Sequence, residues 1–224
     1  IESNQILQEK HEIALNSCFQ LYQNNYKVVS LGGGHDYGYS DCAAFLKTVL
    51  ASNIEDRPLI INYDAHLDVR PNTQNNHSGT PFYRLKKEFQ NSFDLIEVGL
   101  QPQCNSVNHW NWAHDQNIST LSLNELETSD WQKFYKLPLI SNLAPNQPVF
   151  ISLDMDVLSS ADAGGCSQSW PTGLKIKDVL NSIHYLCGKS NVLGLGIYEV
   201  APCFDHDFKT SKAAALFIYN YIFH

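Results

Sequence analysis

Long apolar runs are absent from this sequence of 224 residues. A membrane-spanning helix needs about 18 or more consecutive apolar residues, and since no segment reaches that length we expect no membrane partner. The N-terminal segment also lacks the basic start and the apolar run of a secretory signal. Because the chain does not begin with Met, a leader removed by processing is still compatible with this sequence.

Cysteine occurs six times, yet no CxxC or zinc-finger spacing is present. Scattered cysteines in a chain of this size suit a reducing compartment and ordinary packing better than a disulfide framework. We therefore predict a cytoplasmic protein whose cysteines are structural.

Basic residues are in deficit, since 15 Lys and Arg stand against 23 Asp and Glu, for a net charge of −8. Neutralising nucleic-acid phosphates needs a surplus of Lys and Arg, so nucleic acid is an unfavourable partner. Such a charge commonly serves solubility. A cluster of metal-binding aspartates would produce the same excess, and composition alone does not separate these two explanations.

Repeats, low-complexity tracts and flexible linkers are missing as well, which favours one domain over residues 1–224. Strands alternating with helices, most strands being continuously apolar, predict an α/β fold with a parallel sheet covered on both faces. The expected strands are 26–31, 58–63, 93–100, 118–123, 148–156 and 191–200. The expected helices are 5–24, 39–51, 80–89, 105–116, 128–142, 175–188 and 208–222.

Acidic residues and histidines follow three of these strands, where ligands bind in parallel sheets. Alternate residues of an extended segment point to the same side, so the side chains of each motif are expected to converge. The candidates are His35 in GGGHD, Asp64, His66 and Asp68 in DAHLD, and Asp154 and Asp156 in LDMD.

These six residues favour a metal centre over the bland alternatives, a solvated DxD motif and a turn into a helix. Crowded carboxylates raise one another's pKa values unless a cation neutralises them. Imidazole together with carboxylate suits Mn²⁺, Zn²⁺ or Fe²⁺, and a set rich in oxygen favours Mn²⁺. Six ligands exceed the needs of one tetrahedral zinc ion. Two ions about 3.5–4 Å apart could share bridging carboxylates and hold a hydroxide as the nucleophile.

The same motifs carry a family resemblance. GGGHD, DAHLDVR, SGTPF, SLDMDVLSSADAGGCS and YEVAP occur in the order seen in the ureohydrolase (arginase-like) family, and their variants resemble the formimidoylglutamase branch. The resemblance implies a three-layer α/β/α fold, a mostly parallel central sheet and two Mn²⁺ ions per chain. It also implies hydrolysis of the C–N bond of a small-molecule amidine or guanidine, and it leaves a homo-oligomer open.

By position, the resemblance assigns a role to each candidate. One manganese ion would be held by His35, Asp64, Asp68 and Asp154, and the other by Asp64, His66, Asp154 and Asp156. Asp64 and Asp154 would then bridge the two ions. Glu199, in YEVAP, matches the acidic residue that pairs with the cationic nitrogen group of the substrate; without the resemblance it would be an exposed glutamate at a strand end.

Two further positions bear on the substrate. Arg70 resembles the arginine of formimidoylglutamases, and a guanidinium can clamp a carboxylate with two hydrogen bonds; the alternative is a surface arginine in a charged loop. Ser78 stands where arginases and agmatinases carry a proton-shuttling histidine, and His77 lies one residue early. The substrate that these residues favour is N-formimidoyl-L-glutamate, hydrolysed to L-glutamate and formamide.

The sequence departs from the family at three places. AGG replaces the APG of the family, and Trp170 is bulky in a loop expected to border the substrate pocket. Only 34 residues precede His35, fewer than in the family, so the domain is expected to lack family N-terminal residues. Agmatinase or another guanidino or amidino hydrolase, and a noncatalytic metal-binding homologue, remain as alternatives; a one-metal zinc deacetylase ranks lower.

Overall fold

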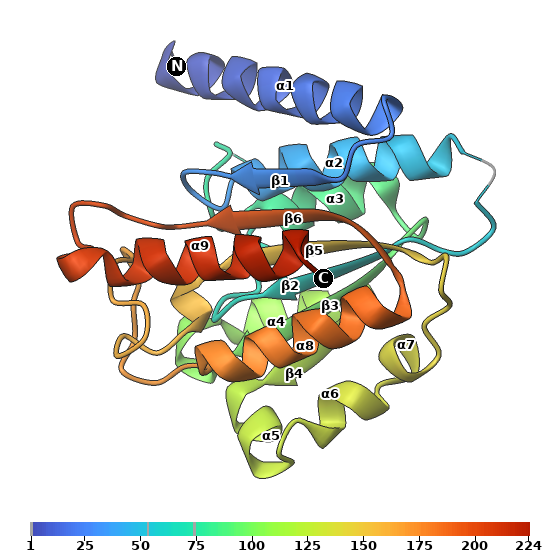
Figure 1. The fold of residues 1–224 in the computed structure, drawn as a ribbon. Coiled ribbons are helices and arrows are strands. Elements are labelled where there is room, and N and C mark those ends of the chain that lie inside the picture. The colour runs from blue at the N-terminus through green and yellow to red at the C-terminus, as the bar shows by residue number, and fades with distance from the viewer. Residues whose placement is uncertain (1, 53, 74) are drawn as a thin grey trace.

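The computed structural model describes residues 2–52, 54–73 and 75–224. These residues contain a six-stranded sheet of order β1-β6-β5-β2-β3-β4, with every neighbouring pair parallel (Figure 1). The strands are β1 (Val28–Leu31), β2 (Leu59–Tyr63), β3 (Asp94–Leu100), β4 (Ser119–Ser122), β5 (Pro148–Asp154) and β6 (Asn191–Tyr198).

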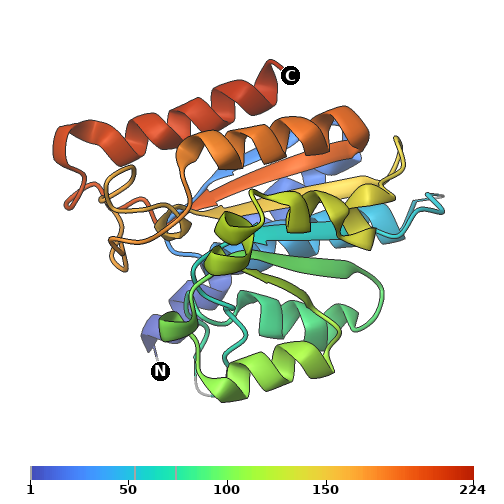
Figure 2. The ribbon, with the colours of Figure 1, turned by 90° about the horizontal axis from the view of Figure 1, so that it is seen from below.

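Helices cover both faces of the sheet (Figure 2), which confirms the predicted three-layer α/β/α fold. The helices α1 to α4 pack on one face, and α5 to α9 pack on the other. Their bounds are α1 (Glu2–Gln23), α2 (Tyr37–Leu50), α3 (Pro81–Phe89), α4 (Val107–Asp115), α5 (Leu123–Thr128), α6 (Gln132–Lys136), α7 (Pro138–Ser141), α8 (Ile176–Lys189) and α9 (Lys209–Ile222).

Strand β2 shows why the predicted strands are mostly apolar. All five of its residues are buried. Leu59 and Ile61 belong to the core beneath α8 and α9, whereas Ile60 belongs to the core beneath α2 and α3. Successive side chains point to opposite faces, and because each face is covered, both faces need apolar residues. Each buried aliphatic side chain stabilises the fold by about 1.5–3 kcal/mol.

The single helix predicted over 128–142 is wrong. The structure replaces it with the end of α5 and the short helices α6 and α7. Asp130 and Trp131 adopt left-handed φ values of 47° and 61°, which stop a right-handed helix. Leu137 is extended, with ψ of 133°, because it precedes Pro138. Trp131 is buried in the core, so its packing favours the turn over a continuous helix.

Three predicted strands extend too far at their C-terminal ends, and the one predicted over 191–200 ends at Tyr198. The strand predicted to end at Asp156 ends at Asp154, and Met155–Val157 form a turn of 3₁₀ helix. The strand predicted over 118–123 ends at Ser122, which caps α5 in a reciprocal pair of hydrogen bonds with Glu125. These last two endings turn the chain away from the sheet directly after the last paired residue.

The strand order reverses between β2 and β5, in the middle of the sheet. The chain runs outward from β2 through β3 to β4, then returns to place β5 on the other side of β2. Ligands bind at such a switch point, beyond the carboxyl ends of the strands. Across the three described ranges, no helix has both the length and the apolar content that a membrane crossing requires.

Candidate metal centre

The segments that follow β2 and β5 fold in the same way. Asp64 Oδ1 accepts a hydrogen bond of 2.7 Å from the backbone N–H of His66. Asp154 Oδ1 accepts one of 2.8 Å from the backbone N–H of Asp156. A carboxylate that accepts from the amide two residues ahead forms a tight turn. The side chains therefore converge through turns, not through the extended backbone expected from their alternation.

His35 comes to the same place from the loop before α2. Its ring is fully buried and stacks on the ring of Tyr198, with centroids 4.7 Å apart. His35 Nε2 lies 2.8 Å from Ser152 Oγ. In the tautomer whose Nε2–H donates to Ser152, Nδ1 keeps a free lone pair. Nδ1 lies 2.9–3.2 Å from carboxylate oxygens of Asp64, Asp68 and Asp154.

The structure brings the six predicted metal residues together in two groups. In each group, one ligand atom from every residue lies within 4.8 Å of the others. The groups are His35, Asp64, Asp68 and Asp154, and Asp64, His66 and Asp156. Asp64 belongs to both groups, as a bridging ligand must. Asp154 belongs to the first group alone, so its role as a second bridge stays a prediction.

The carboxylates of the site repel one another. Burial and the charge of Asp64 raise the pKa of Asp68 to about 7 and that of Asp156 to about 6. Burial and the charges of Asp156 and Asp64 raise the pKa of Asp154 well above its usual range. Asp64 differs, because although burial opposes its ionisation, the adjacent rings of His35 and His66 lower its pKa.

The two histidines respond in the opposite direction. Burial disfavours a charged His35 ring, but its contacts with Asp154, Asp64 and Asp68 raise its pKa well above the usual range. Burial likewise opposes charge on His66, and Asp156 and Asp64 raise its pKa to about 12. Bound protons therefore balance part of the negative charge of the carboxylates. A divalent cation would balance more of that charge.

Two orphaned atoms show that the residues fit such a cation. His35 Nδ1 and Asp156 Oδ1 are buried, and neither has a hydrogen-bond partner within the described part of the chain. Buried polar atoms normally have a hydrogen-bond partner, so an unpaired ligand atom in each group destabilises the fold. Coordination of a metal ion would remove that destabilisation. The donor set of carboxylate oxygens with one imidazole in each group suits Mn²⁺.

A pocket of about 240 Å³ opens onto the two groups. The three predicted substrate residues, Arg70, Ser78 and Glu199, all line it. Ser167 and Gln168 line it too, so the loop that carries Trp170 borders the pocket as expected, although Trp170 is not itself a lining residue. The pocket therefore combines metal ligands with cationic, hydroxyl and acidic side chains.

Glu199 is fixed against the loop that carries His35. Its Oε1 accepts a hydrogen bond of 2.9 Å from the backbone N–H of His35, and its own N–H donates to Gly33 O at 2.8 Å. Its Oε2 lies 3.5 Å from Ser167 Oγ, across the pocket. Glu199 has φ of +64°, a strained conformation of the kind found at functional sites. It is therefore more than an exposed glutamate at a strand end.

Arg70 is exposed at the rim of the pocket, and a backbone hydrogen bond fixes its main chain. Its N–H donates to Gly79 O at 2.8 Å. A Cβ atom at Gly79 would lie 2.8 Å from Arg70 Cδ, so only glycine leaves room for this path of the arginine side chain. The side chain of Arg70 thus lines the pocket from its exposed side.

Sequence reasoning missed the polar residues beneath the ligands. Ser152, Asn62 and Glu97 are fully buried, and apolar or aromatic residues flank each of them in its strand. A signal was present: Asn62 and Ser152 each precede a ligand by two residues and so share its face of the strand. Ser167 and Gln168 offered no comparable signal, because they lie in an irregular loop.

Comparisons with known proteins agree with this geometry. Residues 3–224 match the arginase family. A formimidoylglutamase of Bacillus subtilis (strain 168) is 32% identical over 193 residues, which are 83% of this chain and 57% of that protein.

Solved structures are similar over most of the chain. The crystal structure of a formimidoylglutamase of Bacillus subtilis superposes with a TM-score of 0.84 at 28% identity, covering 96% of this chain and 66% of that one. A formiminoglutamase of Trypanosoma cruzi, solved with Mn²⁺, gives a TM-score of 0.81 at 25% identity, covering 96% and 71%. The chain spans 57–65% of the length of the curated relatives that it matches. It belongs to the arginase family.

Proposed function

We propose that this chain is a binuclear manganese hydrolase that cleaves the C–N bond of an amidine. The proposed reaction converts N-formimidoyl-L-glutamate and water to L-glutamate and formamide. The observation that carries the proposal is the sharing of Asp64 between two groups of mostly buried ligands, four of which line one pocket. The formimidoylglutamases among its relatives support the choice of substrate.

Manganese ions bound here would supply a nucleophile from water and stabilise negative charge at the amidine carbon. Asp64 and Asp154 are proposed as the bridging ligands. The complete proposed sets are His35, Asp64, Asp68 and Asp154 for one ion, and Asp64, His66, Asp154 and Asp156 for the other. Ser152 and Asn62 orient ligands from beneath, since they contact His35 and Asp64.

Glu199 is proposed to hold the amidinium group of the substrate. Its Oε1 already accepts from the His35 amide, so Oε2 is the oxygen that faces substrate. A carboxylate fixed by a backbone hydrogen bond loses little freedom when substrate binds, so it orients the amidine at small entropic cost.

Arg70 and Ser78 are proposed to bind the other end of the substrate. The Arg70 guanidinium can form two parallel hydrogen bonds with a carboxylate, and N-formimidoyl-L-glutamate carries two carboxylates. The Ser78 hydroxyl can donate to either of them. A cation at this rim repels agmatine, whose far end is positively charged, so charge favours an anionic amidine over agmatine.

A substrate panel tests the proposal. The purified chain is loaded with Mn²⁺ and supplied with N-formimidoyl-L-glutamate, agmatine, arginine and an uncharged amidine. We expect the highest kcat/KM for N-formimidoyl-L-glutamate, with formamide and glutamate as products. A preference for agmatine would overturn the substrate but not the metal chemistry. Two bound ions without turnover of any substrate would identify a noncatalytic homologue.

A further inference from the structure

Three polar side chains occupy one row across the centre of the sheet, directly beneath the metal ligands. Asn62 of β2 is the register partner of Ser152 in β5 on one side and of Glu97 in β3 on the other. All three are fully buried. In a sheet covered on both faces these positions are expected to be apolar, so the row needs a separate explanation.

Two members of the row contact ligands. Ser152 Oγ lies 2.8 Å from His35 Nε2. Asn62 Nδ2 lies 3.4 Å from Asp64 Oδ2, the ligand shared by both groups. Among the described residues Glu97 has no hydrogen bond to a ligand, but its Oε2 accepts a hydrogen bond of 2.7 Å from Asn62 Nδ2. The amide nitrogen of Asn62 therefore lies between the carboxyl groups of Glu97 and Asp64.

Glu97 is costly for the fold. Its Oε1 and the Oδ1 of Asn62 are buried without a hydrogen-bond partner in the described ranges. Burial raises the pKa of Glu97 well above its usual range, and a buried polar atom left unpaired destabilises a protein by about 1–3 kcal/mol. An apolar side chain would fill this position at lower cost, so stability does not account for Glu97.

The orientation of the Asn62 amide offers the explanation. An amide presents either NH₂ or C=O to a neighbour, and only NH₂ attracts a carboxylate. Because Glu97 accepts one N–H of Asn62, the second N–H is left to face Asp64. A flipped amide would turn Oδ1 toward the carboxylate of Asp64, which repels it, and would leave Glu97 Oε2 without its N–H donor.

We propose that Glu97 is a positioning residue for the metal centre, acting through Asn62 to hold the carboxylate of Asp64 in place for two cations. The inference rests on the proposed metal site, and nothing in it depends on the identity of the amidine. Removing outer partners of metal ligands typically weakens metal binding by about 10- to 100-fold.

The test measures binding of Mn²⁺ alone, by competition with a chelator. Glu97→Met keeps the length of the side chain but removes the acceptor, and we expect about 10-fold weaker Mn²⁺ binding. In Glu97→Gln the side-chain carbonyl can still accept from Asn62, so the affinity should stay within about threefold of wild type, at most about 0.7 kcal/mol. This rescue separates hydrogen bonding from the charge of Glu97.

A double-mutant cycle tests the route through Asn62. Asn62→Leu should also weaken Mn²⁺ binding, and Glu97→Met should have no further effect in that background, because contacting residues are non-additive. Ser182→Ala is the matched control: it removes a buried hydrogen bond of 2.8 Å with Tyr63, the next residue of β2, which faces away from the ligands. It should lower unfolding stability without changing Mn²⁺ affinity.

The outcomes separate this inference from the proposed function. If wild type binds Mn²⁺ and Glu97→Met binds it equally well, the positioning role is wrong and the proposed function stands. Additive losses in the double variant, or a loss in Ser182→Ala as large as in Glu97→Met, would also overturn it. If wild type binds no Mn²⁺, the proposed function and this inference fail together.

Discussion

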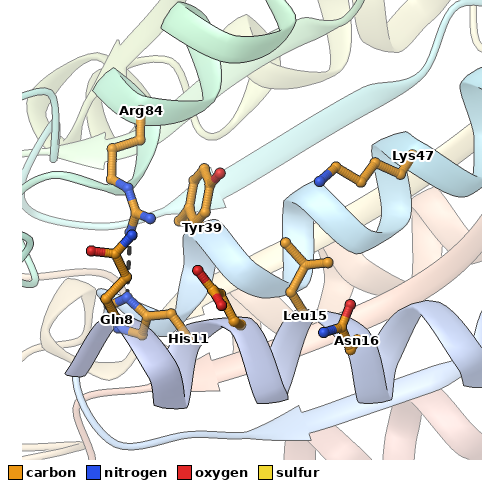
Figure 3. A pocket seen from close by; sticks show the side chains of 8 residues that line it. Gln8, His11, Leu15, Asn16, Tyr39, Lys47 and Arg84 are labelled. Atoms are coloured by element: carbon orange, nitrogen blue, oxygen red, sulfur yellow. Dashed lines mark hydrogen bonds between the residues drawn. The ribbon is translucent and has the colours of Figure 1, made fainter. Parts of the chain in front are cut away.

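Two pockets of this molecule differ in how their charges are used. The larger one, about 360 Å³, lies between α1, α2 and α3 (Figure 3). Lys47 at its edge pairs with Glu88 at 3.5 Å, and Arg84 stacks 3.5 Å from the centre of the Tyr39 ring. His11 bonds Asp36 at 2.5 Å. These side chains satisfy one another.

The metal pocket is smaller, about 240 Å³, and its groups satisfy one another only in part. His35 Nδ1 and Asp156 Oδ1 have no hydrogen-bond partner among the residues that the structure covers, and the carboxylates raise one another's pKa values. Cavity size therefore does not locate the chemistry of this protein. The chemistry is located instead by converging ligand atoms that lack hydrogen-bond partners, because a bound cation would be their missing partner.

The largest expected effect comes from removing a charge at the metal pocket. Asp154→Asn should lose at least one metal ion and reduce kcat by more than about 10³-fold, since losing an ion removes more stabilisation than the roughly 10²- to 10³-fold supplied by one preorganised donor. Asp94→Asn is the control, because Asp94 pairs with Arg57 at 2.9 Å where β3 begins. Equal activity in both variants would show that Asp154 holds no metal ion that the reaction needs.

The second-largest effect is expected from lowering the pH, which should weaken Mn²⁺ binding at the metal pocket. Ligands must lose their protons to bind metal. The raised pKa values of His66, about 12, and Asp68, about 7, mean that protons compete with Mn²⁺ at neutral pH. Affinity should rise with pH, by about tenfold per pH unit for each proton displaced, and so by at least about 10²-fold between pH 6 and pH 8. Titration with Mn²⁺ at both values checks this; an affinity independent of pH would contradict it.

Arg70→Ala should have a smaller and selective effect. Losing one partner of a desolvated charge pair costs about 2–5 kcal/mol, and because Arg70 is exposed at the rim we expect the lower end, about 30-fold in kcat/KM. The loss should appear with N-formimidoyl-L-glutamate and stay within about threefold for an uncharged amidine. Equal losses for both substrates would instead show that Arg70 supports the ligand loop.

The smallest effect is expected at the larger pocket. Lys47→Ala breaks an ion pair between half-exposed side chains, and such pairs contribute about 0–1 kcal/mol to stability. Kinetic assays should give a kcat/KM within about threefold of wild type, since no metal ligand is disturbed. A decrease as large as that of Arg70→Ala would mean that both pockets serve the reaction.

The sequence was enough to predict the ligands because each of them follows an apolar strand, and such a strand is recognised from its own residues without knowing which strands pair with it. It could not reach Glu97, whose role depends on the register between β2 and β3; Asn62 and Glu97 are 35 residues apart. The break at Asp130 and Trp131 was missed for a related reason: the buried Trp131 side chain, a tertiary feature, outweighs local helix propensity there.

The metal content of the loaded protein tests the central claim most directly. The chain is saturated with Mn²⁺, unbound ions are removed by gel filtration, and manganese is measured by elemental analysis against protein concentration. Because Asp64 belongs to two separate ligand groups, two manganese ions per chain are expected. One ion or none would contradict the binuclear centre.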